Sequence, residues 1–477
     1  MTSPRTPGLL LCVISLLVLG GATFAPVLQL NFVNWDDPAY VLDNPLIRSW
    51  SPAGLWGIAT ETITRNYAPL TILTLLADYT LWGLDPAGYH LTNLLLHLVC
   101  GILVLLLIRQ LTGSLIIAWT TAALFLVHPV QVETVAWVAS RKGLLSGVFM
   151  LSALLVRLRP DAGPRHDGWY IGMLAAALLS KALAVILPPI VLVYDILLRR
   201  EKYSDALVRQ VIPGLMSLLL LLHTMGAQNS IMGGMRGHME LSLLQILAAD
   251  MLILWRYLAM LAYPCDLCVL YDPPVTGIAV PAVAAAAGWC GAVALLIRLR
   301  TRSLLWPFGG ICFLLLLFPV LNFFRITSLM NDRYLYLPCV VIFAMAAATL
   351  QSAGGRLRTI VGRSGGVWIR PLQAGLVGTA LCCCVVLTRM QLPVWQNSES
   401  LWTDAMQRGP WIPVVRIQMA LTLHDSGRIA KAVQVMQQAL QECSPDELDR
   451  ARMVRAISDW TEKLGTEHRF VASESAD

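Results

Sequence analysis

Two adjacent carboxylates, Asp36 and Asp37, follow the first long apolar segment of the chain. Neighbouring carboxylates raise each other's pKa, which suits a general base that takes up a proton near neutral pH. An Asp-Pro step also starts a turn and can cap a short helix, so Asp37-Pro38 has a structural alternative. The pair is the candidate catalytic base, and a helix-capping turn is the alternative.

Cations lie close to the ends of apolar segments. Arg141 and Lys142 follow His128 and Glu133 after only a few residues, and Lys181 stands between two short apolar runs. Arg333 precedes another such run. Arginine contacts phosphate through two parallel hydrogen bonds, and lysine acts as a compact charge. These residues therefore predict a site for an anionic lipid headgroup, while the alternative is that the cations only extend their side chains to the membrane interface.

His90, Asn93 and His97 form a polar stripe within one apolar segment. Spacings of three and four residues place all three side chains on one face of a helix. A polar stripe in a membrane span faces the interior of the helix bundle or a water-filled cavity. The stripe could line a substrate cavity, or it could join helices by hydrogen bonds.

The composition identifies the setting of these groups. Charged residues are 13% of the 477 residues, where a soluble domain has about 25%. Hydrophobic residues are 57%, the mean hydropathy is +0.65, and the apolar residues come in blocks of about 20, enough to cross a bilayer. These values exclude a soluble enzyme, a disordered chain and a fibrous chain, and a net charge of +6 is too small to indicate nucleic acid as a partner.

The chain is expected to be an all-α, polytopic membrane helical bundle with about eleven spans. A twelfth candidate, 246–262, is less apolar because it contains Asp250 and Arg256. The first run, from Gly8 to Leu30, is too long for the core of a signal peptide and is expected to remain as a span. The expected spans are 9–29, 90–108, 113–127, 135–157, 169–182, 183–198, 206–225, 276–297, 303–320, 334–351 and 372–390.

The arginine and lysine pattern orients the spans. If 246–262 does not cross fully, 16 of the 26 Lys and Arg residues before the tail lie on one side, which the positive-inside rule assigns to the cytoplasm. The N-terminus is then cytoplasmic. The candidate residues and the C-terminal tail are extracytoplasmic.

Two domains are expected from the change in composition at residue 391. Residues 1–390 form the membrane domain, whose first external loop, 31–88, contains a candidate surface helix at Pro69–Trp82. In the tail, 391–477, small and apolar residues recur at spacings similar to those of a TPR unit. The tail is therefore predicted to be a short TPR-like array, and a generic helical hairpin is the alternative.

Several motifs together resemble one family. Asn34-Trp35-Asp36-Asp37 resembles the acidic first-loop motif of GT-C glycosyltransferases. The remaining motifs are similar to those of the transmembrane-and-TPR, TMTC-type O-mannosyltransferases and their bacterial relatives: Tyr67-Ala68-Pro69-Leu70-Thr71, Gly83 to Asn93, His97, His128-Pro129-Val130, Glu133, Val135-Ala136-Trp137, Arg141-Lys142, Ser180-Lys181, Asp195 and Arg333 to Pro338. The resemblance implies an acidic residue after the Arg-Lys pair in many members of this family, and this chain has Gly143 there.

The resemblance implies a GT-C-like fold and an inverting transfer of a sugar, a hexose such as mannose, from a polyprenyl-phosphate donor. The acceptor would be a hydroxyl of a protein or glycan outside the cytoplasm, and a bacterial inner membrane is the expected location. No metal or other cofactor is expected, because fixed cations can serve a monophosphate leaving group. By resemblance, Asp36 or Asp37 is the base, Glu133, His90 and His128 orient the substrates, and the lipid phosphate is bound by Arg141, Lys142, Lys181 and Arg333.

Two other functions remain open. A catalytically silent assembly protein would keep the fold and recruit protein partners through the TPR-like tail. A transporter would need charged groups through the membrane midplane and internal repeats. The charged candidates instead gather at one face, which disfavours the transporter.

Overall fold

The structure is a computed structural model that describes residues 6–64, 66–159, 163–229, 241–323, 328–443, 445 and 447–474. Within these ranges the protein is helical and contains no β-strand; one isolated bridge joins Ile63 and Asn66. The prediction of an all-α bundle is confirmed.

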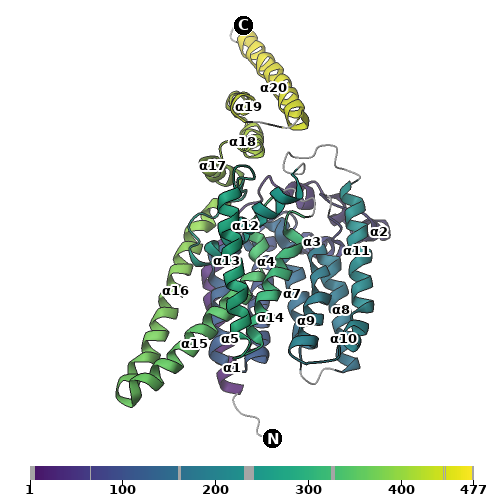
Figure 1. Cartoon of the computed structure of the whole chain (residues 1–477). Helices are drawn as coiled ribbons and strands as arrows, with labels where there is room; N and C mark the ends of the chain where they lie inside the picture. The colour runs from purple at the N-terminus through teal and green to yellow at the C-terminus, as the bar shows by residue number, and fades with distance from the viewer. Residues whose placement is uncertain are drawn as a thin grey trace.

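The membrane domain is a bundle of roughly parallel and antiparallel helices (Figure 1). All eleven segments expected to be spans are helical. The main helices of the bundle are α1 (Thr6–Phe24), α4 (Pro86–Thr112), α5 (Leu115–Val127), α7 (Arg141–Arg157), α8 (Pro164–Ser180), α9 (Leu187–Leu197), α11 (Val211–Asn229), α12 (Leu243–Ala262), α13 (Ala279–Leu299), α14 (Leu305–Leu317), α15 (Pro338–Gly365) and α16 (Ile369–Gln391).

The number of membrane crossings depends on how bent and short helices are counted. Within the described residues, seven helical stretches are long and apolar enough to cross a membrane, or up to nine if each of two bent pairs is one span. The stretches Ala182–Leu197 and Leu305–Val320 are apolar but shorter. The chain is thus an integral membrane protein with several spans.

The helix α12 bears on the twelfth candidate span. By length and composition it could cross a membrane. However, Oδ1 and Oδ2 of Asp250 lie 3.4 Å and 3.3 Å from the backbone N of Asn322, which follows α14 and the one-turn helix Phe318–Val320. The Leu261 carbonyl lies 3.2 Å from Nε2 of His128, directly after α5. Both partners follow the ends of helices that point toward the tail. These contacts favour incomplete crossing by 246–262, which remains a prediction.

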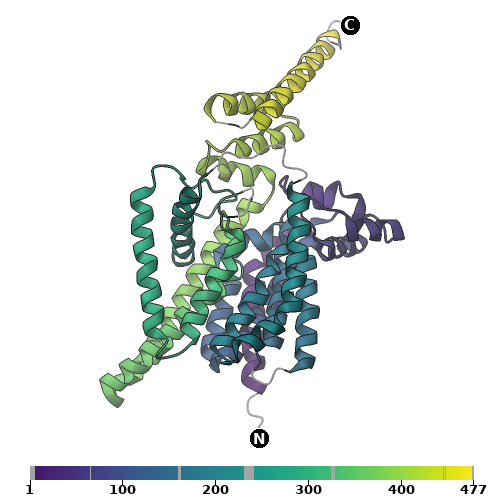
Figure 2. The same cartoon turned by 45° about the vertical axis from the view of Figure 1, so that its right-hand side comes forward.

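The two ends of the bundle differ in charge and in attached structure. The start of α1, the short helix α10 (Tyr203–Arg209) and the turn between α15 and α16 lie at the lower end (Figures 1 and 2). Arginines are frequent in and beside these segments, at Arg199, Arg200, Arg209, Arg356, Arg358 and Arg370. The tail and the helices of the first loop, α2 (Pro52–Thr60) and α3 (Pro69–Trp82), lie at the opposite, upper end.

The helix α4 shows how the sequence sets helix boundaries and packing. The side chain of Asp85 accepts a hydrogen bond from the Ala87 N–H, Pro86 starts the helix, and Gly113 ends it with a φ of +67°. A Cβ atom at Gly101 would lie 2.5 Å from a methyl carbon of Leu126, so this glycine allows α4 and α5 to approach closely. His97 joins the same helices through Nε2, 3.2 Å from the Leu126 carbonyl oxygen.

The tail consists of α17 (Ser398–Arg408), α18 (Pro413–Asp425), α19 (Ile429–Glu442) and α20 (Glu447–Glu474). Figure 1 shows these helices stacked above the bundle, with α20 pointing away from it. The hydrophobic core of the membrane domain continues without a break into Trp402 and Val415, whereas Ala420 to Trp460 form a separate core. The first tail helix therefore packs as part of the membrane domain. The TPR assignment and the boundary at 390 and 391 remain predictions.

Candidate active site

The two carboxylates after the first span have different surroundings. Asp37 is 1% exposed, and its two oxygens accept hydrogen bonds from the backbone N–H groups of Val33, at 3.0 Å, and Ala139, at 2.9 Å. Burial raises the pKa of Asp37 to about 7, although the two backbone hydrogen bonds favour the ionised form. Because both carboxylate oxygens accept backbone hydrogen bonds, Asp37 holds the first loop against the segment before α7.

Asp36 is the accessible member of the pair. Its side chain is 27% exposed, and Oδ2 lies 3.4 Å from Nζ of Lys142 at the start of α7. The same Nζ lies 3.3 Å from the hydroxyl of Tyr40 and 4.6 Å from the centre of the Tyr40 ring. One face of Asp36 thus meets a cation while the other is open, as a general base requires.

A second ion pair lies beside the first. Glu133 is buried in the short helix α6 (Val132–Ala136), where Oε1 accepts a hydrogen bond from the Arg333 guanidinium. Its Oε2 accepts another from the backbone N–H of Arg333 at 2.8 Å. The indole of Trp137 contacts both cations, with its ring centre 5.3 Å from the Arg333 guanidinium carbon and 5.7 Å from Lys142 Nζ. Trp137 therefore brings the two ion pairs together.

Lys181 is the third cation of this group. Among the described residues its ammonium group makes no hydrogen bond or ion pair, and Lys181 lines a small cavity of about 20 Å³ together with Arg333, Tyr334 and Gly143. Burial, together with the nearby charges of Lys142 and Arg333, lowers the pKa of Lys181 to about 7. An unpaired cation facing a cavity beside two paired ones suits an anionic ligand. Lys142, Lys181 and Arg333 are called the cation cluster below.

Arg141 is not part of the cation cluster. Its guanidinium is completely buried and pairs with Asp78 of α3, with 2.7 Å between Nη2 and Oδ2. It also donates hydrogen bonds to Asn93 Oδ1 and, at 2.8 Å, to the Tyr89 carbonyl. These contacts join α3, α4 and α7, and they leave Arg141 inside the bundle rather than in a phosphate site.

The two candidate histidines are also buried in the packing. The His90 ring lies against the backbone of Leu30 and Asn31 without a well-formed hydrogen bond. His128 Nδ1 accepts a hydrogen bond from the Val130 N–H at 3.3 Å, as a helix cap does. The structure thus brings Asp36, Glu133, Lys142, Lys181 and Arg333 together, with Asp37 behind them, and places Arg141, His90 and His128 in the surrounding framework.

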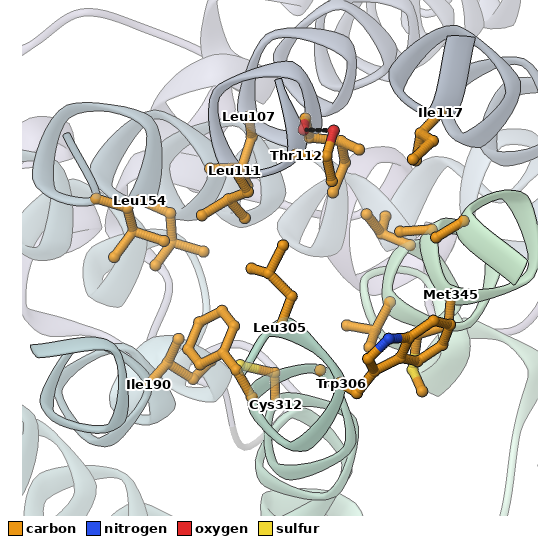
Figure 3. A pocket seen from close by; sticks show the side chains of 18 of the residues that line it. Leu107, Leu111, Thr112, Ile117, Leu154, Ile190, Leu305, Trp306, Cys312 and Met345 are labelled. Carbon is orange, nitrogen blue, oxygen red and sulfur yellow. Dashed lines mark hydrogen bonds between the residues drawn. The ribbon is translucent and has the colours of Figure 1, made fainter. Parts of the chain in front are cut away.

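An apolar cavity of about 290 Å³ lies inside the bundle (Figure 3). Figure 3 shows side chains from several helices turned toward it, among them Leu111, Leu154, Ile190 and Trp306. Three residues, Met150, Leu316 and Leu337, line both this cavity and the small cavity beside Lys181. The apolar cavity and the small cavity beside Lys181 are therefore neighbours that share part of their wall.

Two residues at the site were not among the site residues predicted from the sequence. Tyr40 lies four residues after Asp36 in the one-turn helix Pro38–Leu42, so helical spacing from Asp36 could have identified it. Asp332 accepts a hydrogen bond from the Tyr271 hydroxyl at 2.5 Å, and burial together with the charge of Glu133 raises the pKa of Asp332 well above its usual value. No periodic pattern links Tyr271 to Asp332, because they belong to separate loops.

Comparison with known proteins gives matches to part of the chain. No protein-family model matches it. The protein O-mannosyl-transferase Tmtc3 of Drosophila melanogaster is 34% identical over 199 residues, which cover 34% of this chain and 22% of that relative. F38B6.6 of Caenorhabditis elegans, named a protein O-mannosyl-transferase, is 28% identical over 217 residues, 43% of this chain and 31% of the relative.

The human protein O-mannosyl-transferase TMTC3 is 30% identical over 177 residues, which cover 34% of this chain and 19% of the relative. The chain is similar to the TMTC-type O-mannosyltransferases. This similarity confirms the resemblance expected from the sequence motifs. The chain covers less than a third of the length of each of these three relatives.

Solved structures give weaker matches to the TMTC-like chain. ArnT from Cupriavidus metallidurans bound to undecaprenyl phosphate has 15% sequence identity and a TM-score of 0.41, covering 93% of this chain and 82% of that one. The Archaeoglobus fulgidus oligosaccharyltransferase tethered with an acceptor peptide has 13% identity and a TM-score of 0.46, covering 88% of this chain and 58% of that one.

Proposed function

We propose that the chain is an integral-membrane glycosyltransferase that moves a sugar from a polyprenyl-phosphate donor to a hydroxyl group of a protein or glycan. One observation carries the proposal. An accessible carboxylate, Asp36, and a cluster of three cations share one end of the bundle, and an apolar cavity shares wall residues with the small cavity beside Lys181 and Arg333. This arrangement provides a base, an anion site and a space for a lipid.

The cation cluster and the apolar cavity suit the two parts of the donor. Lys181 is free to bind a phosphate, with Arg333 and Lys142 beside it as further positive charges. The polyprenyl chain would lie in the cavity shared through Met150, Leu316 and Leu337. A site of this kind binds phosphate and apolar chain together, so it would select a lipid-linked sugar over a free sugar phosphate.

The proposed reaction is a single displacement. The acceptor oxygen forms a bond to the anomeric carbon of the sugar while the bond from that carbon to the phosphate oxygen breaks. The hydroxyl proton passes to Asp36, and the negative charge that develops on the phosphate is stabilised by the cation cluster. One displacement inverts the anomeric configuration. Arginine and lysine can serve this leaving group, so the step is proposed without a metal.

The sugar and the location are also proposals. The names of the curated relatives support mannose as the sugar. The arginine-rich ends of the helices lie opposite the site, which supports an extracytoplasmic site and tail by the positive-inside rule. The bacterial inner membrane and a protein partner on the tail remain predictions.

Mass spectrometry of extracytoplasmic glycans and glycoproteins tests the proposed function. Cells that lack the chain would be complemented with the wild type, with Asp36→Asn, or with Asp43→Asn as a control. Asp43 is an exposed carboxylate of the same loop that makes no side-chain contact among the described residues. We expect a hexose modification with the wild type and the Asp43 variant but not with the Asp36 variant.

The same comparison addresses the assembly-protein alternative. If glycans are identical with and without the chain, the proposed function is wrong. If Asp36→Asn restores the modification as well as the wild type does, the chain supports glycosylation without catalysing it. The carboxylate would then be dispensable, as expected for an assembly protein.

A further inference from the structure

The loop that carries Asp36 is held by the tail. Asn34 lies two residues before Asp36, and its backbone N–H and both polar atoms of its side chain form hydrogen bonds with tail residues. Its backbone N–H donates to Ser398 Oγ at 2.9 Å, and its Nδ2 donates to the Gln418 carbonyl at 3.3 Å and to Thr422 Oγ1 at 2.8 Å. Its Oδ1 accepts a hydrogen bond from the indole N–H of Trp402. These partners come from both α17 and α18.

Further contacts extend this connection along the loop. The backbone N–H of Asn31 donates to the Gln396 carbonyl at 2.9 Å, and Gln396 Nε2 donates to the Gln29 carbonyl at 2.7 Å. The indole of Trp35 meets the edge of the Trp402 indole, with ring centres 5.3 Å apart and an angle of 64°. Trp402 is completely buried in the core that continues from the membrane domain. The tail is therefore joined to the loop by hydrogen bonds and by a buried aromatic contact.

The other side of the loop is held by the membrane domain. Asp37 binds the backbone of Ala139, and the backbone N–H of Tyr40 donates to the Asp36 carbonyl at 3.0 Å. Asp36 thus stands between one anchor on the tail, through Asn34, and one on the bundle, through Asp37. Lys142, Lys181 and Arg333 make no hydrogen bond to α17 or α18 within the described ranges.

We propose that α17 and α18 are a positioning element of the active site: through Asn34 they fix Asp36 relative to the cation cluster. This inference rests on the proposed function. Asn34 and Trp402 are positioning residues, because they act through Asp36 and do not contact the substrates. Anything that moves α17, including a protein bound to the tail, would then change the rate of transfer. The tail is accordingly part of the catalytic unit as well as a candidate surface for partners.

The geometry predicts a specific kinetic signature. Weakening the contacts of Asn34 misplaces the base but leaves Lys181 and Arg333 in place, because these two cations lie against the bundle and make no hydrogen bond to the loop within the described ranges. A misplacement of about 1 Å can lower a rate by about a hundredfold. We therefore expect kcat to fall while the KM and the Kd for the lipid donor stay unchanged. A tail that is only attached to the bundle would leave kcat unchanged.

Four variants of the full-length protein test this signature. Thr422→Val removes the hydroxyl that accepts from Asn34, and Trp402→Phe removes the indole donor while keeping an aromatic ring. Thr422→Ser restores the hydroxyl and serves as the rescue. Arg428→Gln is the matched control, since it breaks an ion pair of 2.8 Å to Glu399 inside the tail and does not touch the loop.

The expected result is a fall in kcat of about tenfold or more for Thr422→Val and Trp402→Phe, from the positional argument above. The donor KM should stay within about twofold, and the serine variant and the Arg428 variant should match the wild type. If the first two variants have the kcat of the Arg428 control, the inference is wrong. If kcat falls together with the binding of the lipid phosphate, the tail acts on the whole site, which also overturns it.

Hydrogen exchange separates this inference from the proposed function. If the wild type transfers no sugar, exchange of the backbone amides in 31–37 still reports whether the tail holds the loop. We expect faster exchange in this segment for Thr422→Val and Trp402→Phe than for Arg428→Gln, with no change around Lys181. Equal exchange in all three variants would exclude the positioning role regardless of any enzymatic activity.

Discussion

Nζ of Lys142 lies 3.4 Å from Oδ2 of Asp36, joining α7 to a loop 106 residues earlier in the chain. An ion pair with an exposed member contributes at most about 1 kcal/mol to stability. Replacing Asp36 therefore tests the chemistry of the site rather than the fold. Asp37, its neighbour, is buried and makes hydrogen bonds only to the backbone, so the two carboxylates should respond differently to the same substitution.

Asp36→Asn should abolish transfer without unfolding the protein. The amide keeps the size of the side chain but cannot take up the acceptor's proton, and loss of a general base lowers a rate by about 10²–10⁴-fold. Transfer would be measured with purified protein and a lipid-linked sugar, and folding by thermal unfolding in detergent. Asp43→Asn is the control. Wild-type activity in Asp36→Asn would refute the assignment of the base.

Asp37→Asn should destabilise the protein. The asparagine has one carbonyl oxygen in place of two carboxylate oxygens, so either Val33 or Ala139 loses the acceptor for its buried N–H. An unsatisfied buried donor costs about 1–3 kcal/mol. Thermal unfolding of the full chain should show a lower midpoint for this variant than for Asp36→Asn. Equal midpoints for the two variants would contradict the anchoring role of Asp37.

Asp37 also predicts a pH dependence of stability. Because its pKa is about 7 when folded and near 3.8 when exposed, the folded state holds a proton between these values that the unfolded state has lost. The stabilisation from Asp37 is therefore complete below about pH 4 and is lost as the pH rises toward 7. Subtracting the pH profile of Asp37→Asn from that of the wild type should isolate this slope. A flat difference would show that Asp37 is ionised throughout.

Most of the fold follows from hydrophobic periodicity and length. The eleven apolar segments are helical, and Pro69–Trp82 is a helix with the bounds expected from its flanking Pro69 and Gly83. The packing of the tail could not be predicted, because Asn34 and Trp402 are 368 residues apart and no pattern links them. Side-chain partners between distant segments are set by the three-dimensional packing, not by local spacing.

The sequence predicted most of the charged residues of the site, but not which role each of them has. A cation beside an apolar segment suggests function, yet Arg141 is neutralised by Asp78, a partner that lies on another helix. Glu133 and Arg333 were both candidates, and the structure joins them directly. The sequence therefore identified charged residues whose placement near a membrane costs free energy. Only the structure could show which of them are paired with an opposite charge.

Lys181 predicts that binding of a lipid phosphate weakens above neutral pH. Burial lowers the pKa of Lys181 to about 7, so its positive charge is present below that pH and lost above it. A hydrogen bond to a charged group contributes about 1.5–3 kcal/mol, so the Kd for polyprenyl phosphate should rise by about tenfold or more. Binding would be measured at several pH values on the purified protein.

Lys181→Arg is the control for this pH dependence. A guanidinium stays charged across the accessible range, so the Kd of this variant should not rise above neutral pH. Ionisation of the phosphate itself is the same in both measurements and cancels in the comparison. If the arginine variant keeps the pH dependence of the wild type, another group is responsible and Lys181 does not bind the phosphate.

Gly143→Asp should place a competing carboxylate in the anion site. A Cβ atom at residue 143 would lie 3.7 Å from Lys181 Nζ, and its other contacts are at 3.9 Å, so a side chain fits there without a clash. Gly143→Ala is the matched control and should bind the lipid phosphate like the wild type, with about 1 kcal/mol of added helix stability. The aspartate would instead pair with Lys181 and repel the phosphate, because like charges oppose binding at this distance.

We expect a Kd for polyprenyl phosphate at least about tenfold higher than that of the alanine variant, equivalent to about 1.4 kcal/mol. Equal affinities for the two variants would show that the phosphate binds away from Lys181. A higher Kd in the aspartate variant alone would mean that the glycine keeps Lys181 available to the donor.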